Sequence, residues 1–188
     1  FLYGKKENVD LRKVGSGNVG TTNTMRNLGV KAGILTLIGD VCKVFMAMVI
    51  VWLIFRNRYP DSVKVLELYA GVGCILGHDF PAYMKFKGGK GIAVSFGSLL
   101  GLIPMWYPVL SLAVCFLFFS LVIQISPNFY RTVAVYIVNW LIIVFSETNL
   151  PKAVHIGVGL ISLLILLKMH MSQEEREKMT FQLLWIKR

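Results

Sequence analysis

Charged residues are scarce in this chain. Asp, Glu, Lys and Arg make up 16% of its 188 residues, against roughly a quarter in a typical soluble domain. Apolar residues reach 55%, and the mean hydropathy is +0.63. A soluble domain of this composition would have too little polar surface to face water. The composition therefore predicts an integral membrane protein.

Acidic residues and cysteines are also few. Ten Asp and Glu stand against twenty Lys and Arg, which gives a formal net charge of +10. The positive charges lie mostly between apolar runs and form no basic helix face, so we expect no nucleic-acid binding. Cys42, Cys74 and Cys115 each lie in a separate apolar run. Because no two of them have metal-ligand spacing, we predict neither a zinc site nor a disulfide framework.

Six apolar segments follow a polar opening stretch. A helix that crosses the hydrocarbon of a bilayer needs about 20 residues, and several segments are shorter, which indicates a compact bundle that is thin in places. Buried helices of a soluble protein are the alternative, but six in succession would leave little to face water. We therefore predict an all-α fold, a polytopic transmembrane helix bundle with six spans in a single domain. The segments are residues 32–55, 65–77, 91–105, 106–124, 132–145 and 153–167.

Lysine and arginine are divided unequally between the two sides of such a bundle. With six spans, the opening stretch, the loops at 81–90 and 125–131, and the tail share one side. That side holds 15 of the 20 Lys and Arg, and the other side holds four. The positive-inside rule predicts that the first side is cytoplasmic.

Two patterns in the first two segments concern packing. Gly73 and Gly77 form a G-x-x-x-G pattern, which predicts the close approach of another helix. Asp40 and Lys43 are three residues apart and so share a helix face. Since charges at membrane depth are costly, we expect the two to pair and to face the bundle interior. They form either a structural ion pair or a polar wall of a site.

The opening loop (residues 9–20) is dense in glycine and polar groups. Gly15-Ser-Gly-Asn-Val-Gly20 fits G-x-G-x-x-G, but the strand and βαβ unit of a dinucleotide site are missing. Backbone N–H groups of glycine turns bind anions, and Arg26 can bind a phosphate through two hydrogen bonds. A plain turn is the alternative; the density of polar groups favours phosphate binding. Short hydrogen-bonding side chains are supplied by Ser16, Asn18, Thr21, Thr22 and Asn23.

The lysine loop (residues 80–91) carries the second polar motif. Lys90 stands between glycines directly before an apolar segment, where backbone N–H groups and the helix dipole attract an anion. The order differs from a Walker A loop because a glycine follows the lysine. His78 precedes this loop and is interpreted as an interfacial histidine. His170, at the end of the last segment, lies on the same predicted side and is a candidate for the same site.

Together these motifs resemble the acyl-phosphate-dependent glycerol-3-phosphate acyltransferases of bacterial membranes, the PlsY family. The run from Val9 to Arg26 is similar to the family's first motif, and Gly77 to Gly91 is similar to the second. Asp40-x-x-Lys43 resembles a family pair in the intervening helix. In the third motif this chain has Gln173 where the family has asparagine, and Gln182 is the candidate for a family glutamate.

The resemblance implies a multi-pass enzyme of the bacterial inner (plasma) membrane with its active site facing the cytoplasm. It would transfer a fatty acyl group from acyl-phosphate to the 1-hydroxyl of sn-glycerol 3-phosphate, giving lysophosphatidate and phosphate, without a cofactor or metal. The family has seven spans, so six spans here imply that a first helix is missing before Phe1. Carried over by position, the catalytic residues are Ser16, Arg26, Lys90 and His170, and the phosphate-binding residues are Gly15, Gly17, Asn18, Gly20, Thr22, Asn23, Gly88, Gly89, Gly91 and Gln173.

The mechanism that this resemblance implies is direct attack by the glycerol hydroxyl. Acyl-phosphate is already activated, and no G-x-S-x-G nucleophile elbow is present, so positioning and electrostatics would supply most of the rate. Either His170 or a substrate phosphate oxygen would act as the base. The alternatives are a catalytically impaired paralogue and a membrane protein that binds or transports a phosphorylated solute. A transporter typically shows repeated halves, and we find no internal repeat.

Overall fold

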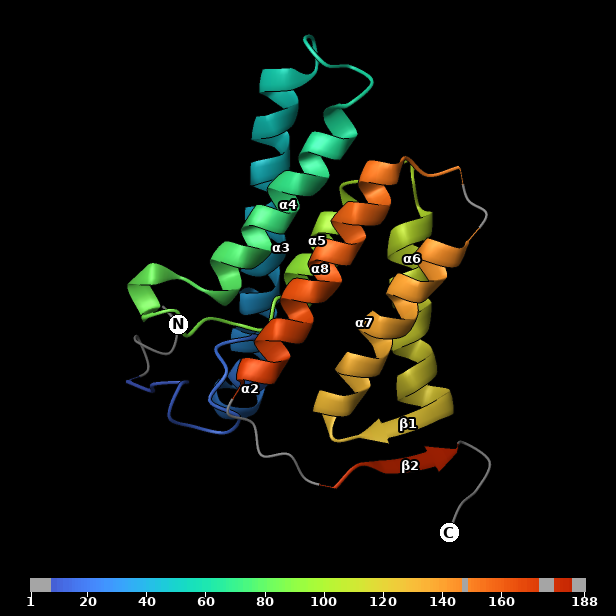
Figure 1. The fold of residues 1–188 in the computed structure, drawn as a ribbon. Coiled ribbons are helices and arrows are strands. Elements are labelled where there is room, and N and C mark those ends of the chain that lie inside the picture. Colours follow the sequence, from blue (N-terminus) through green and yellow to red (C-terminus); the bar gives the residue numbers. More distant parts are fainter. Residues whose placement is uncertain (1–7, 147–148, 173–177, 184–188) are drawn as a thin grey trace. The chain divides into compact units, whose positions relative to one another are not determined.

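The chain folds into helices and one small sheet, arranged as two units. The structure is a computed structural model that describes residues 8–146, 149–172 and 178–183. Its contacts divide the chain into Phe1–Leu102 and Ile103–Arg188, which Figure 1 shows as ribbons.

The first unit is built around one long helix, α3. Helices α2, α4 and α5 all pack against α3, and α4 also packs against α5. Figure 1 shows α3 and α4 running side by side. The elements of this unit are α2 (Thr21–Leu28), α3 (Val30–Phe55), α4 (Val63–Asp79), the 3₁₀ turn η1 (Ala82–Met84) and α5 (Ile92–Leu100).

The second unit combines three helices with a two-stranded sheet. Helix α7 packs against both α6 and α8, and strand β1 packs against α7. The two strands are antiparallel, with Ile123 opposite Leu183 and Ser126 opposite Thr180. The elements are α6 (Tyr107–Leu117), the π-helical turn η2 (Phe118–Val122), β1 (Ile123–Ser126), α7 (Asn128–Phe145), α8 (Lys152–Met171) and β2 (Thr180–Leu183).

Each of the six predicted apolar segments contains a helix, but their number as membrane crossings stays a prediction. By length and composition, α3, α7 and α8 can cross a membrane. Helix α5 has 9 residues, or about 14 Å at 1.5 Å per residue, roughly half of a hydrocarbon core. The predicted segment 91–105 is longer than α5 because it contains Gly101 and Pro104, beyond the end of the helix.

Two elements differ from the prediction: strand β1 in the fourth apolar segment, and helix α2 after the opening loop. The fourth segment was predicted to continue to Gln124, but Ile123 and Gln124 lie in β1, where apolar and polar residues alternate as in a strand. The partner of β1 is more than fifty residues along the chain, and local pattern carries no information about such pairing. Helix α2, bounded by Gly20 and Gly29, lies in the polar stretch before the first apolar segment, where no helix was predicted.

The glycine at which α4 approaches α5 is Gly71. A Cβ atom there would lie 2.6 Å from the Cβ of Ser98, which leaves no room for a side chain. A Cβ atom on Gly73 or Gly77 would meet no atom within 4 Å. The predicted close packing at the G-x-x-x-G pattern is therefore wrong in detail, since the tight contact lies two residues earlier.

Replacing Gly71 with alanine should destabilise the first unit by about 1–3 kcal/mol, the usual cost of overfilling a packed interior. Gly73→Ala is the matched control, because the added methyl group meets open space and alanine favours a helix. Thermal unfolding of both variants in detergent micelles measures the difference. Equal melting temperatures for the two would contradict the assigned contact.

Candidate functional site

The side chain of Asn23 holds the opening loop in shape. Its Nδ2 donates to the carbonyl oxygens of Leu11 and Val14, each at 3.1 Å, and of Asn18 at 2.8 Å. Its Oδ1 accepts the backbone N–H of Ser16 at 3.0 Å. Asn23 is 3% exposed, so water does not compete strongly for these hydrogen bonds. One amide in the first turn of α2 thus fixes the loop that carries the predicted catalytic serine.

Gly15 is required by the same arrangement. Its φ is +56°, a conformation that side chains rarely adopt. A Cβ atom there would collide with Oδ1 of Asn23 and lie 2.8 Å from Nδ2 of Asn27. The N–H of Gly17 donates to the carbonyl oxygen of Val14 at 3.1 Å. Gly15 therefore has a steric task, and the N–H of Gly17 is bonded within the loop; the predicted anion binding by these glycines stays a prediction.

Helix α2 begins directly after the opening loop. Gly20 is its N-cap, and Thr21 and Thr22 start its first turn, where unpaired N–H groups and the helix dipole attract anions. In the described part of the chain, the buried Thr21 hydroxyl has no hydrogen-bond partner. Buried polar atoms usually have one, often a water or an ion. Arg26, exposed in the last turn of α2, carries a positive charge on the same short helix.

Asp10 and Arg12 form an exposed ion pair in the opening loop. The Nε of Arg12 donates to Oδ1 of Asp10 at 2.9 Å, and Nη2 donates to Oδ2 at 2.9 Å. These hydrogen bonds are the main reason why the pKa of Asp10 falls from 3.8 to about 2. The charge of Arg12 is therefore partly offset by a carboxylate at neutral pH.

The lysine loop is fastened to the end of α4. The N–H of Gly88 donates to the carbonyl oxygen of Asp79 at 3.2 Å, and the N–H of Gly89 donates to that of His78 at 3.1 Å. These bonds satisfy carbonyl groups that a helix end otherwise leaves unpaired. The N–H groups of both glycines, predicted to bind phosphate, are thus engaged with α4 in this structure. A phosphate-binding role of these residues stays a prediction.

Lys90 lies between these two hydrogen-bonded glycines and the start of α5. Gly91 is the N-cap of α5, with φ +68°, and its carbonyl oxygen accepts the N–H of Ser95 at 2.8 Å. Lys90 therefore connects the C-terminal end of α4 to the N-terminal end of α5. This matches the predicted position of a lysine directly before a helix.

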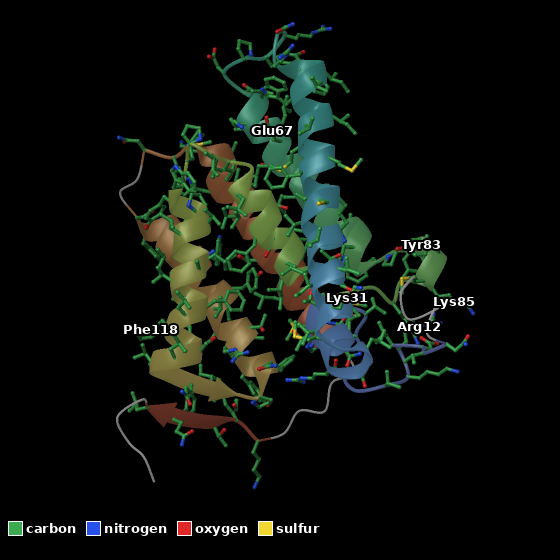
Figure 2. All side chains as sticks on the ribbon, turned by 180° about the vertical axis from the view of Figure 1, so that it is seen from behind. Arg12, Lys31, Glu67, Tyr83, Lys85 and Phe118 are labelled. Carbon is green, nitrogen blue, oxygen red and sulfur yellow. The ribbon has the colours of Figure 1, made fainter. Side chains whose placement is uncertain are left out.

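An apolar cluster brings the two loops together. Leu11 and Val19 of the opening loop and Met84 of η1 are packed in one buried cluster, with Val14 and Leu28 against it. Met84 lies in the lysine loop. In Figure 2 the labelled Arg12, Tyr83 and Lys85 lie toward one end of the first unit, and Glu67 lies toward the other. Ser16, Arg26 and Lys90 therefore belong to segments that share one end of this unit.

The predicted pair of Asp40 and Lys43 forms, and it includes a third residue. Nζ of Lys43 lies 2.8 Å from Oδ1 of Asp40. Nδ1 of His78, from α4, lies 3.4 Å from the same carboxylate oxygen and within hydrogen-bond distance of Nζ of Lys43. This contact has no local signal, because His78 is 35 residues from Lys43 and lies on another helix.

The remaining predicted residues lie in the second unit. His170 is exposed in the last turn of α8, and its membership of the site stays a prediction. Gln182 lies in β2 opposite Gln124. Gln173 lies outside the described residues.

Replacing Asn23 with alanine should loosen the opening loop, because each buried group left unpaired costs about 1–3 kcal/mol. Hydrogen exchange of residues 10–18 should become faster in purified protein. Asn27→Ala is the matched control, since it removes only the hydrogen bonds that Asn27 donates to Asn23. Unchanged exchange in Asn23→Ala would show that this amide does not hold the loop.

Comparison with known proteins finds glycerol-3-phosphate acyltransferases. The model of the family described as glycerol-3-phosphate acyltransferase matches residues 1–178. The glycerol-3-phosphate acyltransferase of Exiguobacterium sibiricum is 43% identical over 111 residues, 58% of this chain and 50% of that protein. That of Bacillus subtilis is 41% identical over 122 residues, 64% of this chain and 59% of that protein. The chain thus spans only about half to three fifths of these relatives.

Two solved structures have the same fold. A crystal structure of PlsY (YgiH), an integral membrane glycerol 3-phosphate acyltransferase, in its glycerol 3-phosphate form has a TM-score of 0.70 and 27% sequence identity, over 94% of this chain and 86% of that chain. The lysophosphatidic acid form has a TM-score of 0.67 and 26% identity, over 93% and 85%. With the family match over nearly its whole length, the chain belongs to the glycerol-3-phosphate acyltransferase family.

Proposed function

We propose that this chain transfers a fatty acyl group from acyl-phosphate to the 1-hydroxyl of sn-glycerol 3-phosphate and releases lysophosphatidate and phosphate. Membership of the family supports this activity. The forms in which the related PlsY was crystallised support it further, because glycerol 3-phosphate is the acceptor and lysophosphatidic acid the product of such a transfer.

The observation that carries the proposal is the packing of the two polar loops against each other. The cluster of Leu11, Val19 and Met84 packs the opening loop against the lysine loop. Arg26 lies on α2, which follows the opening loop, and Lys90 lies in the lysine loop. The reaction involves two phosphate-bearing substrates, so two cationic segments at one end of a unit fit its charge. The buried Thr21 hydroxyl without a partner among the described residues supports a polar ligand at the start of α2.

In the proposed reaction, the 1-hydroxyl oxygen attacks the carbonyl carbon of acyl-phosphate. The bond between that carbon and the phosphate oxygen breaks, and the phosphate leaves with the electron pair. The hydroxyl proton goes to His170 or to a phosphate oxygen. Arg26 and Lys90 hold the phosphates and stabilise the charge that develops on the leaving group, as preorganised donors do in other transfers. Ser16 is assigned to orient the acceptor hydroxyl.

The proposed setting is the bacterial inner membrane, with the polar loops facing the cytoplasm. Three helices long and apolar enough to cross a membrane support it, as does the excess of Lys and Arg on the side of both loops. No cofactor or metal is proposed. The partners of the chain are then its two substrates and the lipid bilayer.

The activity is tested with the purified protein in lipid nanodiscs. Incubation with glycerol 3-phosphate and acyl-phosphate should release phosphate and form lysophosphatidate, whereas acyl-CoA should not serve as donor. If no product formed with acyl-phosphate or with acyl-CoA, the proposal would be contradicted. Binding of glycerol 3-phosphate without turnover would instead favour a catalytically impaired relative, for which Gln173 in place of the family's asparagine is the reason to look.

Replacing Arg26 or Lys90 with alanine should lower kcat/KM by about 10²–10³-fold, the usual loss when one charge-stabilising donor is removed. Arg58→Ala is the matched control, because Arg58 follows the opposite end of α3 from the opening loop and should leave the rate within about threefold, as is usual for exposed residues away from a site. The initial rate of phosphate release gives the comparison. A normal rate in Arg26→Ala would remove this residue from the site.

A further inference from the structure

His78 lies between the half-buried ion pair of Asp40 and Lys43 and the backbone of the lysine loop. Its side chain is 11% exposed. On one edge of the ring, Nδ1 contacts Lys43 and Asp40 of α3. On the other edge, Nε2 lies against Gly89, where an added Cβ atom would collide with it. The imidazole therefore connects α3 to the segment that leads into Lys90.

The contact with Lys43 decides which ring nitrogen carries a proton. An ammonium group has donors only, so Nζ of Lys43 can form a hydrogen bond with Nδ1 of His78 only when Nδ1 accepts. A proton on Nδ1 would also face this ammonium, which lies nearer to Nδ1 than the Asp40 carboxylate oxygen at 3.4 Å does, and like charges repel. The geometry therefore assigns the neutral ring with the proton on Nε2, the nitrogen that lies against Gly89. Asp40 holds Lys43 in place from the same helix face.

The backbone of the same residue completes the contact. The carbonyl oxygen of His78 accepts the N–H of Gly89 at 3.1 Å. A Cβ atom on Gly88 would collide with this oxygen and lie 2.5 Å from Cδ of Pro81. Side chain and backbone of His78 thus both border the two residues before Lys90, and only glycines fit there.

We propose that Asp40, Lys43 and His78 form a positioning relay for Lys90. The ion pair fixes the tautomer and orientation of His78, and His78 fixes the backbone of Gly88 and Gly89. This backbone sets the direction in which the ammonium of Lys90 meets a phosphate. The step from Lys90 to phosphate rests on the proposed function; the steps from Asp40 to Gly89 do not.

Helix α4, which carries His78, also supplies a matched control. Lys64 and Glu67 also form an ion pair three residues apart, with Nζ of Lys64 3.0 Å from Oε2 of Glu67 and 3.2 Å from the carbonyl oxygen of Gly101. Glu67 is 3% exposed, so this pair is buried at least as deeply as that of Asp40. It lies eleven residues before His78, or about 16 Å along α4. Removing the Lys64–Glu67 ion pair tests whether the loss of any ion pair of this kind has the same effect on the lysine loop.

The first experiment measures the relay without any activity. Nitrogen-15 NMR of ring-labelled histidine in the protein, which has three histidines, should show Nε2 of His78 protonated and Nδ1 unprotonated. Lys43→Met should change the His78 signals and speed hydrogen exchange of residues 86–91, whereas Lys64→Met should change neither. A protonated Nδ1 in the unmodified protein, or a loop unaffected by Lys43→Met, would overturn the relay.

The second experiment measures how the relay affects KM for the phosphorylated substrate. Lys90→Ala first identifies the phosphorylated substrate that depends on the lysine. For that substrate, His78→Asn and Lys43→Met should raise KM by about 10–100-fold, with kcat changed far less, because a misplaced binding group can cost up to two orders of magnitude. His78→Gln, whose amide nitrogen reaches the position of Nε2, should recover most of the loss. Lys64→Met should leave KM within about threefold, as distant sites act independently.

The two proposals fail in different ways. If the protein binds glycerol 3-phosphate but turns nothing over, the proposed function is wrong, and dissociation constants of the same variants then test the relay in place of KM. If the protein turns over and His78→Asn lowers kcat and stability while KM stays unchanged, the residue is structural and the relay is wrong.

Discussion

Polar groups set among apolar helices must find their partners within the chain, because hydrocarbon offers none. A buried polar group has the same need wherever it lies, and two side chains of the first unit meet it. Asn23 satisfies four backbone groups of the opening loop, and Lys43 lies between Asp40 and His78. In the second unit, the Ser111 hydroxyl donates to Oδ1 of the buried Asn139. Each of these sets includes a contact between residues that lie far apart in the sequence.

The helices could be predicted from composition, and their lengths and partners could not. Long apolar runs indicated where helices occur, and α3, α7 and α8 followed. Within the run 91–105, however, α5 stops at Leu100, because a glycine and a proline favour the end of a helix while the run as a whole stays apolar. The pairing of β1 with β2 depends on residues far apart in sequence, so its register has no local signal.

The candidate site shows the same division. Motif spacing identified Ser16, Arg26 and Lys90 as the residues to examine, and an apolar cluster joins the segments that carry them. The structure adds steric reasons for two of the glycines beside the predicted anion binding. Gly15 is required by the side chain of Asn23, and Gly89 by the ring of His78. Such steric requirements come from neighbours in space, and a single sequence does not name those neighbours.

Two hydrogen bonds between the end of α4 and the lysine loop connect this helix to the polar end of the unit. Because the N–H groups of Gly88 and Gly89 are bonded to the last carbonyl groups of α4, the loop must follow any movement of the helix end. The thickness of the surrounding lipid influences how far a membrane helix tilts. Helix α4 is one of the six predicted spans, and for such a span lipid thickness would have a mechanical path, through the end of one helix and two hydrogen bonds, to the position of Lys90.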